Sequence, residues 1–321
     1  MKFYFAPLEG VTGYIYRNAY NSLFGNINKY FTPFIVPSIN KCLKTRELND
    51  ILPEHNKGMY VVPQILTNNS EYFLDTVNVL KEFGYNEINL NLGCPSGTVV
   101  GKNRGAGFLA LPDELDKFLD EVFSGTDEKI SIKTRIGKDS PDEFYKLLDI
   151  YNKYPLEELI IHPRIQKDYY KNTPNMEIYK YAEEHSKNPL CYNGDIFNVK
   201  DYEKLREEYP SLDSVMLGRG IIANPGLIGE IKNKEVVNKE KLKEFHDMVF
   251  EGYKEILSGD KNALFKMKEF WFYMKNVFAE NDKYAKKIRK TSSVSEYNSI
   301  VNMIFSELEI EQDNSRGFKL L

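Results

Sequence analysis

The stretch EINLNLGCPSGTVVGKNRGAGFLALPDELDKFLDEV (residues 87–122) contains a strand, a loop and a helix, in that order. Residues 87–90 predict a short strand, and a glycine-rich loop follows. Pro112 then opens a helix whose apolar side chains, Leu115, Phe118 and Val122, recur at helical spacing. The stretch therefore predicts one βα unit of a parallel sheet.

The same alternation extends along most of the chain. The expected strands are residues 3–6, 30–36, 59–65, 87–90, 130–134, 158–162, 189–193 and 214–218. Eight strands that alternate with helices over about 220 residues predict an α/β fold of the closed (β/α)8, or TIM barrel, type. Pro33 and Pro63 lie inside two of these runs, and each lacks the backbone N–H that would donate a hydrogen bond to a neighbouring strand. Asn68 is expected to cap the helix that follows the third strand.

The pattern changes after about residue 233. Residues 239–257 and 262–278 have a helical period, and Ser293 with Glu296 forms a capping box for a later helix. No strand-like alternation occurs there. We therefore expect a barrel over residues 1–234 and a small all-α C-terminal domain over residues 235–321.

Composition narrows the classes of function. The 321-residue chain has a net charge of −4 and three cysteines without a CxxC pair, which favours a reducing cytoplasm and no structural metal. No apolar run approaches the ~18 residues of a membrane span. Residues 266–290 nevertheless hold eight basic and three acidic residues, a local excess that points to a polyanionic partner.

Polar side chains end most of the expected strands, and in a barrel these ends form one face. They are Glu9, Gln64, Asn89, Asn91, Lys133, Arg135, His162, Asn193, Asp195 and Arg219. Each one alone could be an ordinary loop start. The whole set favours a shared polar site, because Lys, His and Gln are not the usual turn residues.

Glycine-rich segments follow the last two strands, at NGD (193–195) and GRG (218–220). The loops after strands seven and eight are the usual phosphate site of this barrel, and Arg219 adds a bidentate donor. A phosphorylated cofactor is therefore the leading hypothesis, although glycine-rich junctions are also common without a ligand.

Cys94 follows the fourth expected strand, between Gly93 and Pro95. A lone cysteine is more often a small core residue, but this one precedes a glycine-rich, mobile loop that contains Lys102 and Arg104. That position suits a proton donor. Cys42 and Cys191 have ordinary contexts and are expected to be structural.

Several motifs together resemble those of the tRNA-dihydrouridine synthases. They are APLEGVTG (6–13), PQI (63–65), LNLGCP (90–95), KNRGAG (102–107), KTRIG (133–137), His162 with Arg164, NGDI (193–196) and MLGRG (216–220). The resemblance implies an FMN-dependent reductase that acts on particular uridines of the tRNA D-loop, with tightly but noncovalently bound FMN and with NADPH as reductant. His162-Pro-Arg-Ile stands where the family usually has His-Gly-Arg-Thr.

The resemblance also implies residue roles. The proton donor corresponds to Cys94, and the FMN contacts correspond to Ala6, Pro7, Leu8, Gln64, Lys133, His162, Asn193, Gly194, Asp195, Gly218 and Arg219. Asn91 corresponds to the residue that positions the uracil, and Arg135, Lys102 and Arg104 are expected to contact the substrate.

The helical tail is expected to bind the RNA. Lys261, Lys268 and Lys275 recur every seven residues, and KKIRK (286–290) follows, so we expect phosphate contacts from Lys268, Lys275, Lys287 and Arg289. Such a stripe is otherwise often only a solvated face. The apolar stripe that includes Trp271 is expected to be core.

The chemistry agrees with these residue types. Reduction of the uracil 5,6 double bond needs a hydride, which reduced flavin can supply, and a proton, which a thiol can supply at neutral pH. Two alternatives remain: a flavin barrel reductase for a free pyrimidine, similar to dihydroorotate dehydrogenase, and a noncatalytic RNA chaperone. The expected protein is monomeric.

Overall fold

A computed structural model describes residues 1–38 and 43–311 of the chain, so Cys42 lies outside the described residues. The chain divides into two compact units. The first unit consists of Met1–Pro7, Asn28–Gly194 and Ser211–Met216, and the second consists of Leu8–Ile27, Asp195–Pro210 and the chain from Leu217.

The first unit is built on one sheet of nine parallel strands, in the order β3-β2-β1-β9-β8-β7-β6-β5-β4. The strands are β1 (Lys2–Phe5), β2 (Lys29–Phe31), β3 (Val61–Val62), β4 (Gln64–Ile65), β5 (Glu87–Leu92), β6 (Lys129–Arg135), β7 (Leu159–His162), β8 (Leu190–Tyr192) and β9 (Ser214–Leu217).

Pro63 explains why nine strands are found where eight were expected. It separates β3 from β4 because it has no N–H to donate to a ladder. β3 pairs with β2, β4 pairs with β5, and the amide of Asn89 donates to the Pro63 carbonyl at 2.9 Å. The two short strands are thus one interrupted element that closes the sheet, which confirms the predicted (β/α)8 barrel.

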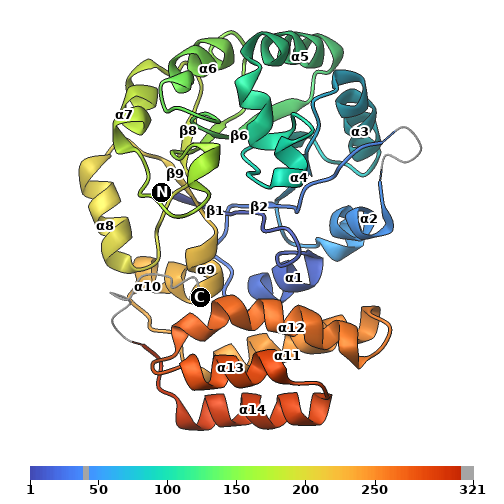
Figure 1. The fold of residues 1–321 in the computed structure, drawn as a ribbon, viewed down its shortest axis with the longest axis vertical. Helices are drawn as coiled ribbons and strands as arrows, with labels where there is room; N and C mark the ends of the chain where they lie inside the picture. Colours follow the sequence, from blue (N-terminus) through green and yellow to red (C-terminus); the bar gives the residue numbers. More distant parts are fainter. Residues whose placement is uncertain (39–42, 312–321) are drawn as a thin grey trace. The chain divides into compact units, whose positions relative to one another are not determined.

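Helices of the first unit lie outside the strands (Figure 1). They are α2 (Thr45–Ile51), α3 (Ser70–Glu82), α4 (Gly97–Val100), α5 (Pro112–Gly125), α6 (Glu143–Tyr151) and α7 (Met176–His185), with 3-10 turns η1 (Pro53–His55), η2 (Gly105–Ala110) and η3 (Gln166–Asp168). Pro112 begins α5 as predicted. The α3 cap is Asn69, not Asn68, and its side chain accepts from the Tyr72 amide at 2.8 Å.

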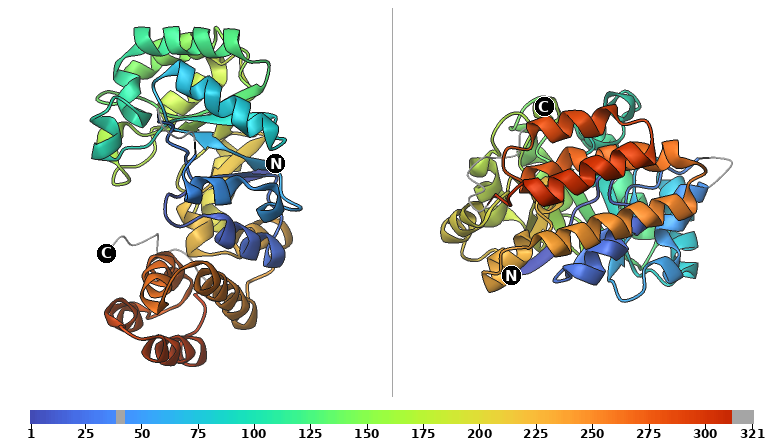
Figure 2. Two further views of the ribbon diagram at one scale, coloured as in Figure 1. Left: turned by 90° about the vertical axis from the view of Figure 1, so that its right-hand side faces the viewer. Right: turned by 90° about the horizontal axis from the view of Figure 1, so that it is seen from below.

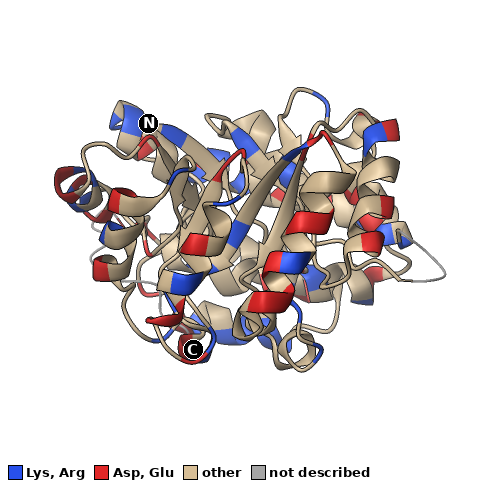
Figure 3. Ribbon diagram, turned by 90° about the horizontal axis from the view of Figure 1, so that it is seen from above, with Lys and Arg blue, Asp and Glu red and all other residues tan. Residues whose placement is uncertain are grey.

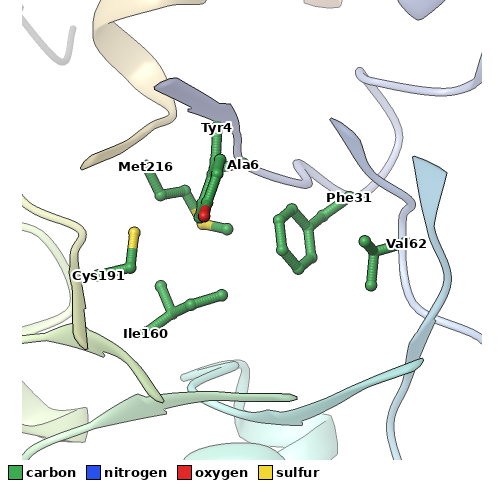
Figure 4. Packing of buried hydrophobic residues seen from close by; sticks show 7 residues of the cluster. All are labelled: Tyr4, Ala6, Phe31, Val62, Ile160, Cys191 and Met216. Carbon is green, nitrogen blue, oxygen red and sulfur yellow. The ribbon is translucent and has the colours of Figure 1, made fainter. Parts of the chain in front are cut away.

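Apolar side chains fill the inside of the barrel. Figure 4 shows them pointing toward one another from different strands: Tyr4, Ala6, Phe31, Val62, Ile160, Cys191 and Met216. Cys191 is fully buried in this core, as expected of a structural cysteine. The inside of the barrel is therefore a packed core, and ligands are expected to bind at the C-terminal ends of the strands.

The second unit is helical. It contains α1 (Tyr14–Leu23), α8 (Val199–Glu208), α9 (Arg219–Ala223), α10 (Leu227–Asn233), α11 (Lys239–Ile256), α12 (Asp260–Met274), η4 (Lys275–Val277), α13 (Asp282–Lys290) and α14 (Val294–Glu307). α13 and α14 lie side by side (Figure 2).

Trp271 of α12 belongs to the core of this unit, as predicted. Its side chain is 2% exposed, and its Nε1 donates to the Tyr297 hydroxyl at 2.8 Å. The Tyr297 hydroxyl also lies 2.6 Å from Nε2 of the buried His246. These polar groups satisfy one another inside an aromatic core, so Trp271 is not a surface ring for nucleic acid.

The predicted boundary between a barrel domain (residues 1–234) and a helical domain (residues 235–321) stays a prediction.

Within the described residues, no helix combines the length and the apolar character needed to cross a membrane. No group of three or more His, Cys, Asp or Glu side chains in those same residues is arranged to hold a metal ion.

Candidate active site

The polar side chains at the strand ends of the first unit form a connected chain of hydrogen bonds. Asn91 Nδ2 on β5 donates to Gln64 Oε1 on β4 at 2.6 Å, and Gln64 Nε2 donates to Asn89 Oδ1 at 2.8 Å. Asn89 Nδ2 in turn donates to Ser131 Oγ on β6 at 2.9 Å. The expected site residues of β4 and β5 are thus held in fixed orientations, with Ser131 of β6 as an additional partner.

The Cys94 turn is fixed by Asn91. Asn91 Oδ1 accepts from the amides of Gly93 and Cys94 at 3.0 and 2.9 Å, which is the local hydrogen-bonding pattern of an Asx turn. The Cys94 carbonyl accepts from the Ala106 amide at 3.1 Å. The half-buried Cys94 side chain therefore projects from a backbone that is held at both its N–H and its C=O.

Gly105 is required by this arrangement. Its φ of +54° favours glycine, and a Cβ built on it would lie 2.9 Å from the Cys94 carbonyl oxygen and 3.0 Å from Cys94 Cβ. The glycine-rich loop after Cys94 thus packs directly on the cysteine backbone.

Lys133 on β6 lies opposite Asn91 of β5 in the register of the sheet. Burial lowers the pKa of its ammonium to about 8, and the positive charge of Arg135 acts in the same direction. Among the described residues, its Nζ makes no hydrogen bond to the protein. A half-buried ammonium without a hydrogen bond to the protein suits an anionic or carbonyl-bearing ligand.

His162 ends β7 and is held by Arg164. The Arg164 guanidinium donates to His162 Nε2 at 3.1 Å and to the Asn172 carbonyl at 2.6 Å. Because Nε2 accepts this bond, the neutral imidazole carries its proton on Nδ1. The Tyr170 ring stacks on His162 with centroids 6.1 Å apart.

Arg135 has a role that its sequence position did not reveal. Its guanidinium is 1% exposed and donates to the carbonyls of Gly93, Ile165 and Tyr169 at 3.0, 2.8 and 2.7 Å. It therefore ties the Cys94 turn to the loop after β7. The expected substrate contact of Arg135 stays a prediction. If Arg135 contacts the substrate, it does so with a guanidinium that three backbone carbonyls already hold in place.

Gln166 was missed by the sequence analysis. Its Nε2 donates to the Pro95 carbonyl at 3.0 Å, one residue after Cys94. Donor and acceptor are 71 residues apart in the chain, so no local pattern could have indicated the pair.

Lys102 and Arg104 lie in the loop between α4 and η2. Asn68 holds this loop, because its Nδ2 donates to the Lys102 carbonyl at 3.2 Å and its Oδ1 accepts from Arg104 Nε at 3.3 Å. Lys102 is exposed and Arg104 half-buried. Asn68, expected to cap a helix, instead orders the loop that was expected to close on the substrate.

Asn193 and Gly194 follow β8 in the first unit. Asn193 Nδ2 donates to the Met216 carbonyl at 2.8 Å, which links the ends of β8 and β9. A Cβ on Gly194 would lie 1.9 Å from the Tyr192 hydroxyl, so only glycine fits there. Ala6 and Pro7 follow β1, and Ala6 is buried in the barrel core.

The remaining expected cofactor residues lie in the second unit. Arg219 donates to Asp195 Oδ1 at 2.5 Å, and its guanidinium lies 5.3 Å from the centre of the Phe197 ring. Gly218 caps α9, and Leu8 donates its amide to Thr12 Oγ1 at 2.8 Å. A Cβ on Gly220 would lie 1.9 Å from the Ile196 carbonyl oxygen, which accounts for the second glycine of GRG.

The basic residues of the tail are not equivalent. Lys287 and Arg289 are exposed on α13, with Lys283, Lys286 and Lys290. Lys268 is half-buried and donates to the Thr291 carbonyl at 2.7 Å. Lys275 is 4% exposed, so the expected solvated stripe ends at Lys268; Lys275 is the C-terminal cap of α12 and opens η4, which packs against α9.

No other helix that the structure describes has a comparable excess of basic residues. In the view of Figure 3, basic and acidic residues are interspersed along the helices. α13 differs because its exposed side carries five cations, with Asp282 as its acidic residue. It is therefore the clearest basic surface that the described residues provide.

The sequence of the chain is similar to those of a known protein family and its members. A family model described as "Dihydrouridine synthase (Dus)" matches residues 4–314. A "tRNA-dihydrouridine(16) synthase" from Pseudomonas putida is 28% identical, with 71% of this chain and 72% of that protein covered. A "Probable tRNA-dihydrouridine synthase" from Staphylococcus aureus is 27% identical, with 99% of this chain and 96% of that protein covered.

Solved structures agree on the fold. The old yellow enzyme from Trypanosoma cruzi superimposes with a TM-score of 0.51 at 9% identity, covering 81% of this chain and 95% of that one. Morphinone reductase in complex with tetrahydroNAD gives a TM-score of 0.51 at 13% identity, covering 76% of this chain and 90% of that one. At these identities the likeness concerns the barrel fold alone.

Proposed function

Because the chain belongs to the dihydrouridine synthase family and is an oxidoreductase of that family, we propose that it reduces specific uridines of the tRNA D-loop to dihydrouridine, using FMN and NADPH. The family match over residues 4–314 carries this proposal. The ordered Cys94 turn beside the strand ends supports it.

The residues of the first unit fit the ring of a flavin. The Lys133 side chain is half-buried and its ammonium makes no hydrogen bond within the described residues, so a carbonyl or anionic ring edge would satisfy it. Gln64 and His162, which the family resemblance also assigns to the flavin, are buried and held by neighbouring polar groups. If bound there, FMN would supply the hydride chemistry that the reduction needs.

Arg219 is the proposed phosphate contact. Arg219 is an always-charged donor, and its bond to Asp195 orients the guanidinium. The close packing of Gly220 on Ile196 keeps this loop free of a side chain at that position. These features are those expected of a phosphate loop.

Cys94 is the proposed proton donor. Thiols are weak acids that can donate a proton at neutral pH, so Cys94 can give a proton to the uracil carbon that does not receive the hydride. Asn91, Arg135 and Gln166 hold the backbone of residues 93–95, which fixes the position from which the Cys94 side chain projects. Asn91 thus acts on Cys94 in addition to its proposed contact with the uracil.

The exposed cations of α13 and Lys268 are the proposed tRNA contacts. Phosphate binding needs accessible Lys and Arg side chains, and these residues supply them on neighbouring helices. Lys102 and Arg104 are proposed to meet the target nucleotide. The uridine must leave the base stack to be reduced, at about a few kcal/mol, and the RNA contacts offset this cost.

The two alternatives predict other behaviour. A reductase of free pyrimidines needs no basic helix such as α13, and a noncatalytic chaperone needs no half-buried lysine without a hydrogen bond at a strand end. We further propose that the protein acts as a monomer in the cytoplasm, without a metal ion.

The proposal is tested with the purified full chain and with tRNA from cells that lack it. We expect a yellow protein with flavin absorbance and NADPH-dependent formation of dihydrouridine at defined D-loop positions, mapped by sequencing. Turnover of free uracil or orotate without activity on tRNA would support the pyrimidine reductase instead. A colourless protein that binds tRNA without changing it would support the chaperone.

A further inference from the structure

α12 carries an exposed aromatic ring that the proposed function has not used. Phe265 is 62% exposed, more than any other large apolar side chain that the structure describes. The buried side of α12 is formed by other residues, which are Ala263, Leu264, Met267, Phe270, Trp271 and Met274. The Phe265 ring is therefore not part of the core of its unit.

Two lysines lie on the same side of the helix as this ring. Lys261 and Lys268 are four residues before and three residues after Phe265. At 100° per residue the three positions fall within about 60° of the helix circumference, and at 1.5 Å rise the lysines lie about 6 and 4.5 Å along the axis from the ring. The surface is thus an aromatic ring between two cations.

This surface continues onto the basic helix α13. The Lys268 ammonium donates to the carbonyl of Thr291, which is the C-terminal cap of α13. Arg289 and Lys290 are exposed in the last turn of that helix. The next acid on the Phe265 side, Glu269, is paired with Lys266 at 2.9 Å and so does not oppose an approaching anion.

We propose that Phe265 is a stacking platform for an unpaired base of the bound RNA, with Lys261 and Lys268 at the adjoining phosphates. The inference rests on the proposed function and adds a base contact to it. Proteins that hold unpaired nucleotides combine a cationic track with exposed aromatic rings, because every base has a face that can stack. A second copy of this chain is a less suitable occupant, since the same cations would then meet one another.

Salt dependence separates stacking from phosphate binding. A phosphate contact releases counterions, so its loss changes the slope of log affinity against log salt, whereas a stacked base contributes equally at every salt concentration. We expect Phe265→Ala in the full chain to weaken binding of tRNA from cells lacking the protein by about 5–100-fold, with an unchanged salt slope.

Three further variants sharpen this test. Phe265→Trp should retain the wild-type affinity, and its new exposed indole should be quenched by tRNA, against the constant signal of the buried Trp271. Phe265→Leu should behave like Phe265→Ala, because an apolar side chain without a ring cannot stack. Met303→Ala, at a 40% exposed apolar residue of α14, is the matched control and should bind like wild type.

The outcomes are distinct. Equal tRNA affinity of Phe265→Ala and wild type would overturn the stacking contact while leaving the synthase proposal intact. A wild-type protein that neither binds nor modifies tRNA would overturn the synthase proposal itself. A change of sedimentation from dimer to monomer in Phe265→Ala would assign the ring to a contact between copies of the chain, and would also overturn the inference.

Discussion

Cys94 shows how a single residue acquires a function from its surroundings. The sequence indicated the thiol and the glycines near it, but not the contacts that hold its backbone. Asn91 lies three residues away and could be recognised as a turn former, whereas Arg135 and Gln166 reach the turn from other strands and loops. Long-range hydrogen bonds of this kind leave no periodic trace in a sequence.

Replacement of Cys94 by alanine should slow uridine reduction by about 10²–10⁴-fold, the range for loss of one positioned acid. Serine should restore little, because an alcohol is a far weaker acid than a thiol at neutral pH. The measurement is single-turnover oxidation of prereduced enzyme by tRNA, followed by flavin absorbance. A rate for Cys94→Ala close to that of wild type would exclude the acid role.

Lys133 illustrates the conflict between binding and stability. Its pKa of about 8 lies below the ordinary value of 10.5, because burial disfavours the charged form. The unfolded chain therefore holds this proton more strongly than the folded one. At neutral pH this difference lowers the free energy of unfolding of the apoprotein, and the loss of stability becomes smaller as the pH rises from about 8 to about 10.5.

Lys133→Met should consequently stabilise the flavin-free protein at pH 7, by roughly 1–3 kcal/mol at 1.36 kcal/mol per pKa unit, while weakening flavin retention. The stability difference should vanish near pH 10.5. Urea denaturation of apoprotein at several pH values measures it, and Lys129→Met, at an exposed residue of the same strand, is the control. A destabilised Lys133→Met apoprotein at pH 7 would contradict the assignment.

At the scale of elements, periodicity located every strand, and the errors have local causes. Pro63 splits one strand, and the residues after Phe31 leave the ladder before Pro33. The α3 cap moved from Asn68 to Asn69 because Asn68 is engaged with the Lys102 loop. Lys275 is buried although the helical period holds up to it, because the turn η4 that it opens packs against α9.

α13 is the element whose charge can be tested alone. Its apolar side, formed by Tyr284, Ala285 and Ile288, packs inward, so changes on the exposed side should leave the fold intact. Replacing Lys286, Lys287, Arg289 and Lys290 with glutamine should flatten the salt dependence of tRNA affinity by about 0.7–0.9 for each lost contact.

Filter binding of tRNA across a range of salt concentrations gives this slope, and circular dichroism checks the fold. A matched control replaces four exposed lysines of the first unit with glutamine, namely Lys57, Lys81, Lys117 and Lys180. If both quadruple variants change the slope equally, the effect is one of net charge, and α13 is not the binding surface.

At the scale of the whole molecule, the sequence predicted the barrel and the helical tail but not the way the chain is shared between compact units. α1 lies early in the chain, yet it packs on α11 of the tail. The Tyr16 ring meets Phe245 edge-on at 5.2 Å, and the Tyr253 hydroxyl donates to the Val11 carbonyl at 3.4 Å. Such contacts join segments more than 200 residues apart, which no local pattern reports.

This sharing of the chain bears on cooperativity. Because the second unit contains segments from before β2 and from between β8 and β9, it cannot unfold without releasing the connections of the barrel strands. We therefore expect the full chain to unfold in one transition. Phe245→Ala should lower the free energy of unfolding of the full chain by about 3–5 kcal/mol, the usual range for loss of a buried aromatic ring.

Two probes test this in a urea titration. Trp271 is the single tryptophan of the chain and reports the second unit, while amide hydrogen exchange in β5 and β6 reports the first. Coincident midpoints, shifted together by Phe245→Ala, are the expected result. If instead Trp271 unfolds first and β5 and β6 stay protected, the helical part folds on its own, as a boundary at residues 234/235 would require.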